Sequence, residues 1–83
     1  MTSVAEVKVA LELSCDHLRD AYRSVHDAQE ALDAAVDLLL EAGANHPESL
    51  LPDGFAAARD RFPDQLALMV NSLELVQRLA VEL

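Results

Sequence analysis

The residues of this chain that could do chemistry are three histidines and a single cysteine. A metal site in a helical bundle needs Glu-x-x-His pairs, because that spacing puts a carboxylate and an imidazole on the same inward face. The residues three positions before His17, His26 and His46 are a serine, an arginine and a glycine. The sequence therefore predicts no metal site and no bound cofactor, and we expect the histidines to be structural or exposed.

The cysteine is not placed to act as a nucleophile. Cys15 is followed by Asp16 and His17, but consecutive residues of a helix point in different directions and do not form a catalytic pair. We expect Cys15 to pack beside a helix seam as a small apolar residue, with an intersubunit disulfide as the alternative. The sequence contains no glycine-rich phosphate loop and no nucleophile elbow.

The arginines do not converge on a pocket either. Small all-helical enzymes aim several basic side chains into the bundle, whereas only Arg59 falls on a predicted seam in this chain. Its expected partner is the acidic end of the first helix. We therefore predict no catalytic residues and no enzymatic activity.

Charge limits the classes of partner. Fifteen acidic and six basic residues give a formal net charge of −9, which disfavours nucleic acid and anionic membranes but leaves a basic protein partner open. No stretch approaches the ~20 apolar residues of a membrane span, and the first ten residues do not resemble a signal peptide. We expect a cytoplasmic protein, with non-classical export as the alternative. Arginine outnumbers lysine and alanine is abundant, which suggests a bacterial source.

The first helix is predicted over about residues 3–43. Ser3 followed by Glu6 is a capping-box pattern, and neither glycine nor proline occurs between them and Gly43, a predicted left-handed C-cap. One apolar row recurs every seven residues: Val4, Leu11, Leu18, Val25, Leu32 and Leu39. Beside it we predict a close-packed row of mostly small residues: Val7, Ser14, Ala21, Ala28, Ala35 and Ala42. This spacing is typical of coiled-coil-like packing.

A connector over about residues 44–53 precedes a second helix over about 53–83. The predicted seam of this helix keeps its phase across Pro63, so we prefer a kinked, collinear helix to a broken one. The seam residues are Phe55, Phe62, Leu66, Met69, Leu73, Val76, Ala80 and Leu83.

These two helices predict an all-α fold, an antiparallel two-helix hairpin forming a single domain over residues 1–83. Acidic residues end the first helix and arginines begin the second, so antiparallel pairing would bring opposite charges together. Apolar residues remain uncovered at the overhanging start of the first helix and on a second row of the other. We predict a homodimeric four-helix bundle, or a heterodimer with a similar hairpin. The predicted self-association interface comprises Val4, Val7, Leu11, Leu68, Leu75 and Val81.

The most distinctive polar feature is an acidic row without intervening basic residues. We interpret it as a solvated face, and the alternative is a docking surface for a basic protein. The row consists of Asp27, Glu30, Asp33, Asp37 and Glu41.

In length, acidity, helix–loop–helix layout and its alanine-rich seam, the chain resembles the small Trp-x-Gly hairpin proteins of type VII secretion and related actinobacterial helical proteins. It lacks their tryptophan, and its only tyrosine, Tyr22, is followed four residues later by His26 in place of the acidic residue of the export signal. No functional residue carries over.

From these observations we predict a non-enzymatic oligomerisation or adaptor module that acts through its apolar helix faces. Two alternatives stay open. The resemblance implies a secretion-associated hairpin that pairs with a similar protein, and the acidic amphipathic helices also suit a small regulator or antitoxin that binds another protein.

Overall fold

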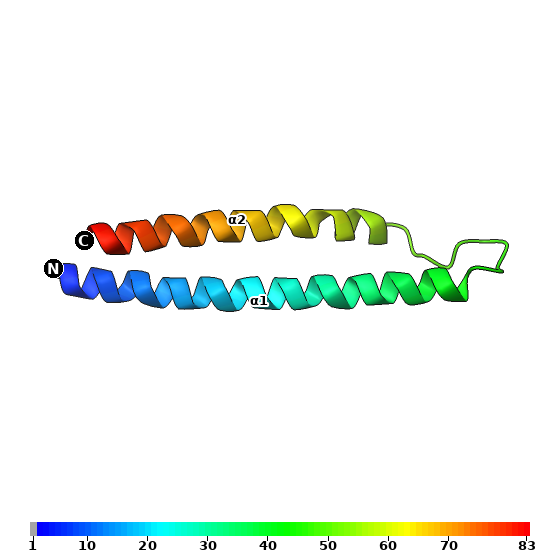
Figure 1. The fold of residues 1–83 in the computed structure, drawn as a ribbon, viewed down its shortest axis with the longest axis horizontal. Coiled ribbons are helices and arrows are strands. Elements are labelled where there is room, and N and C mark those ends of the chain that lie inside the picture. The colour runs from blue at the N-terminus through cyan, green and yellow to red at the C-terminus, as the bar shows by residue number, and fades with distance from the viewer. Residues whose placement is uncertain (1) are drawn as a thin grey trace.

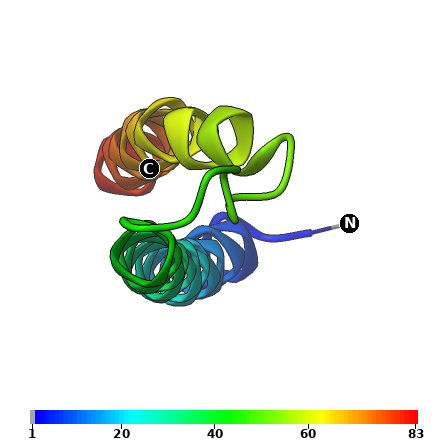
Figure 2. The same ribbon diagram turned by 90° about the vertical axis from the view of Figure 1, so that its right-hand side faces the viewer.

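The computed structural model describes residues 2–83 and contains two long helices. Helix α1 spans Val4–Ala42 and helix α2 spans Phe55–Glu82. They run antiparallel over most of their length, and both chain ends lie at the end of the molecule away from the connector (Figure 1). Viewed along its long axis, the hairpin is a single pair of helices bridged by the connector (Figure 2). The predicted all-α hairpin is confirmed.

Helix α1 begins where its capping residues predict. The Ser3 hydroxyl accepts a hydrogen bond from the Glu6 backbone N–H at 3.1 Å, which satisfies one of the unpaired amides of the first turn. The prediction for the other end was wrong in its conformation. Gly43 has φ −88° and ψ 0°, so it is not left-handed. Glycine suits this position because a larger side chain would be crowded: a Cβ would lie 3.1 Å from the Leu39 carbonyl oxygen and 3.3 Å from Leu50 Cγ.

The left-handed glycine is at the other end of the connector. Gly54 has φ +90° and directly precedes α2, a conformation that favours glycine because it has no Cβ. Helix α2 then continues through Pro63 without interruption, which confirms the continuous helix over the broken one. Proline lacks an N–H, so the Arg59 carbonyl has no helical hydrogen bond at this turn.

The buried stripe of α2 matches its predicted seam, but that of α1 does so only in part. On α1 the Leu11–Leu39 row is half-buried, whereas Ser14, Ala28 and Ala42 of the small row are exposed. The second buried row instead contains Cys15 and Val36, with exposures of 4% and 1%. The small row therefore packs within the hairpin only in part, at the half-buried Ala21 and Ala35. Most residues of the Leu11–Leu39 row have a small or apolar neighbour three residues later and another four residues later. The hairpin buries the row four residues later, which contains the larger Cys15 and Val36.

Two further expectations about the pairing need correction. The extra length of α1 lies mainly at the connector end, where the chain folds back beside it, and not at the chain ends (Figure 1). Val4 and Val7 are nevertheless 60% and 36% exposed. In addition, every ion pair among residues 2–83 lies within one helix. Arg59 pairs with its neighbour Asp60 at 4.0 Å rather than with the acidic end of α1. The predicted charge pairing between the helices is absent, and apolar packing holds them together.

Candidate functional site

Two shallow hollows open along one side of the hairpin, at the junction of α1 and α2. The first has a volume of about 480 Å³ and is lined by Leu18, Arg19, Tyr22, Arg23, His26, Met69, Val70 and Leu73. The second has a volume of about 640 Å³ and is lined by Glu12, Cys15, Asp16, Arg19, Gln77, Ala80 and Val81. They share Arg19, so they follow one another along the same side.

The hollows show which flank of each helix faces this side. On α1 the residues on this side each follow a position of the second buried row, the row that contains Cys15 and Val36. One residue along a helix is a rotation of about 100° around its axis, so these residues flank that row. They carry a charge at each seven-residue repeat, which is about every second turn: Asp16, Arg23, Glu30 and Asp37. On α2 the corresponding positions are Val70, Gln77 and Val81. We call this the charged side of the hairpin.

The opposite side has a different composition. On α1 it carries the residues one position before the second buried row: Ser14, Ala21, Ala28 and Ala35. On α2 it carries the residues one position before the seam residues Met69, Val76 and Ala80: Leu68, Leu75 and Leu79. These three leucines are 66%, 55% and 52% exposed. We call this the leucine side. Its first charged residue toward the connector on α2 is Asp64, followed by Arg61.

The predicted interface residues do not share one surface. Leu68 and Leu75 belong to the leucine side, whereas Val81, which is 83% exposed, lines a hollow on the charged side. Leu11 is half-buried in the seam, while Val4 and Val7 are 60% and 36% exposed at the start of α1. The predicted interface did not include Leu79, although its spacing of four from Leu75 and eleven from Leu68 is the helical repeat that places it with them.

The predicted acidic row lies mostly on the charged side. Asp27, Glu30, Asp37 and Glu41 are exposed, and Asp33 is half-buried. Glu30 also approaches a histidine: its Oε1 lies 3.8 Å from Nδ1 of His26. The His26 ring stacks on Tyr22 with centroids 6.3 Å apart.

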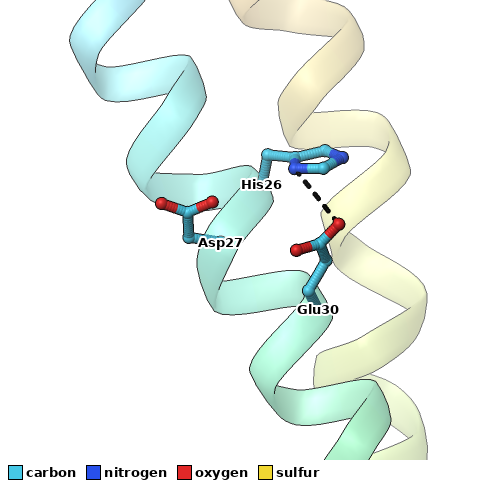
Figure 3. Close-up of side chains that lie close together, drawn as sticks. All are labelled: His26, Asp27 and Glu30. Carbon is cyan, nitrogen blue, oxygen red and sulfur yellow. Dashed lines mark ion pairs between the residues drawn. The ribbon is translucent and has the colours of Figure 1, made fainter.

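One ligand atom each from His26, Asp27 and Glu30 fall within 4.8 Å of one another. Figure 3 shows His26 and Glu30 facing each other while Asp27 extends from the adjoining face of α1. The prediction of no metal site rested only on the lack of inward Glu-x-x-His pairs. It therefore did not cover this cluster, in which Asp27 and Glu30 follow His26 by one and four residues. Because these side chains are exposed or half-buried, water competes for any cation that they could bind.

No protein-family model, curated protein or solved structure matches the chain. The likeness to Trp-x-Gly hairpins is therefore one of layout. Among residues 2–83, neither helix is apolar over a length that could cross a bilayer. The candidate site is the contrast between the two sides of the hairpin.

Proposed function

We propose that this chain is a non-enzymatic association module that acts by packing its apolar helix faces against other helices. The observation that carries the proposal is the amount of surface that the hairpin leaves open. Its accessible surface is 6238 Å², whereas a folded monomeric protein of 9.0 kDa exposes about 4,900 Å². The hairpin therefore exposes about 1,400 Å² more than expected from its mass.

The small core supports the same function. Among residues 2–83, only Cys15, Val36 and Ala80 are buried. The hairpin measures 65 × 18 × 15 Å and has a radius of gyration of 19.3 Å, while a compact chain of this length has about 12 Å. A single layer of two helices has no third element over its flanks, so packing against other helices would bury apolar side chains at little conformational cost.

The experiment that tests this function is the solution mass of the purified protein, measured by light scattering over a concentration series. We expect a mass of two chains that falls toward one chain on dilution. A mass of one chain at all concentrations, together with cooperative unfolding, would contradict self-association. It would then favour a different helical partner, such as a similar hairpin.

A second candidate partner is a basic protein that docks on the acidic row. The observation in its favour is that Asp37 and Glu41 are exposed and form no ion pair with the described part of the chain. Binding through this row would weaken steeply with added salt, because exposed charges are screened within about 10 Å at 0.1 M.

A further inference from the structure

We propose that the leucine side binds the leucine side of a second copy, around a two-fold axis parallel to the long axis of the hairpin. This inference rests on the proposed function and specifies the partner and the contact. In this arrangement α1 of each copy packs against α2 of the other. Each helix of the resulting four-helix bundle then has antiparallel neighbours, the usual arrangement of such bundles.

The hollows on the charged side establish which residues of the two helices lie at the same level along the axis. Leu18 and Tyr22 share one hollow with Met69 and Leu73. Cys15 shares the other with Gln77 and Ala80. In this register Leu68 lies at a level between Ala21 and Ala28, and Leu75 at a level between Ser14 and Ala21.

A rotation about the long axis leaves every residue at its own level. Leu68 of one copy then faces Ala21 and Ala28 of the second copy, and Leu75 faces Ser14 and Ala21. Large side chains thus meet small ones at these two levels, which lets helices approach closely and interdigitate. The members of the small row that the hairpin leaves exposed, Ser14 and Ala28 among them, would then be buried between the two copies.

A two-fold axis perpendicular to the helices fits less well. It would place leucine against leucine on the two α2 helices and small residues against small residues on the two α1 helices. Centring that axis on Leu75 would also leave the connector halves of both copies uncovered, because Leu75 lies near the chain ends. The parallel axis instead overlaps the two copies along their whole length.

Area and charge also favour a second copy as the occupant. The side of a hairpin measuring 65 × 15–18 Å offers roughly 1,000 Å² per copy, while stable interfaces bury about 800 Å² per partner. Each copy carries a net charge of −9, so two copies can associate only through a surface with little charge. The leucine side carries little charge along α1 and, on α2, between Asp64 and Arg78, and Glu82 borders it at the chain end.

Cross-linking of the full chain tests the geometry. In a Cys15→Ala background, Ala21→Cys and Ser72→Cys place single thiols on the leucine side of α1 and of α2. We expect a short bismaleimide to join an equal mixture of the two variants much more than either variant alone. The control mixture replaces Ala21→Cys by Arg23→Cys, which puts the thiol on the charged side and should cross-link poorly. Equal yields from both mixtures, or stronger cross-linking of Leu75→Cys with itself, would overturn the parallel axis.

A pair of glutamate substitutions tests the surface independently. Leu79→Glu and Val81→Glu lie two residues apart on opposite sides of α2. We expect the dimer dissociation constant to rise ~100-fold or more for Leu79→Glu and to change less than ~3-fold for Val81→Glu. A dimer that tolerates Leu79→Glu would refute this surface and leave the proposed function standing, whereas a parent protein that stays monomeric would refute self-association itself.

Discussion

The two sides of this hairpin arise from the same two helices and differ at every turn. On α1, one flank of the second buried row carries Asp16, Arg23, Glu30 and Asp37, and the other flank carries Ser14, Ala21, Ala28 and Ala35. The charged flank is exposed throughout, whereas on the other flank Ser14 and Ala28 are exposed and Ala21 and Ala35 are half-buried. Packing within the hairpin therefore explains the absence of charge on that flank only in part. A helix with no partner on its second flank gains nothing from excluding charge there. The asymmetry is the feature that an intermolecular contact on the leucine side would explain.

The largest expected effect is that of a charge placed on the small row. Ser14→Glu would put a carboxylate against Leu75 of the second copy, where it would lose its hydration without gaining a partner. We expect the dissociation constant measured by sedimentation to rise at least ~100-fold. Ala34→Glu adds the same charge to an exposed position away from both flanking rows and should leave it nearly unchanged. Equal effects of the two variants would remove the distinction between the two sides.

An exchange of size across the contact should have an intermediate effect. Ser14→Leu overfills the space that Leu75 occupies, and we expect it to weaken association by about 1–3 kcal/mol. Leu75→Ala weakens association through lost burial. The double variant places the large residue on α1 and the small residue on α2, so it should recover part of both losses. Strictly additive losses would show that Ser14 and Leu75 do not meet.

Salt should change association less than either substitution. Two copies of charge −9 repel each other, and ions screen this repulsion. We expect the dissociation constant to fall several-fold between ~50 and ~500 mM NaCl, as measured by light scattering. A rise over that range would indicate that ion pairs hold the assembly together, and would move attention to the charged side.

The smallest expected effect belongs to the charged side. Arg19 and Asp16 form an ion pair of 3.1 Å with side chains 47% and 69% exposed. Exposed pairs of this kind contribute less than about 1 kcal/mol. Arg19→Ala should therefore lower the free energy of unfolding in urea by at most about 0.5 kcal/mol and leave the assembly mass unchanged. A larger loss would show that this side also stabilises the hairpin.

Sequence periodicity predicted the helices well because both carry an apolar row that is continuous over many turns. It predicted the seam of α2 from Phe55 to Ala80, although the last predicted member, Leu83, is 51% exposed. It did not predict the second buried row of α1, where apolar or small residues stand on both flanks of the Leu11–Leu39 row. The spacing of apolar residues does not decide which of the two flanks is buried. Packing favours the flank with Cys15 and Val36, because these side chains bury more surface.

The candidate site was predictable only in part for a related reason. Leu68 and Leu75 stand out from the sequence as apolar residues outside the seam, and so does Val81. Their separation onto different sides depends on which flank faces which way after the helices pair. That choice follows from the buried stripes and the hollows rather than from hydrophobicity. The His26, Asp27 and Glu30 cluster was missed because only inward-facing ligand patterns were considered.

The position of both chain ends beside each other, with the connector about one molecular length away, has a mechanical consequence. A force that pulls the two chain ends apart would act on the contacts between α1 and α2 one turn at a time, beginning near Cys15 and Ala80. The two helices would therefore separate progressively at low force. A force applied between the connector and either end would instead stretch one helix along its own axis, against its backbone hydrogen bonds, and would leave the contacts between the helices largely unloaded. The same molecule would therefore yield easily in one direction and resist in the other.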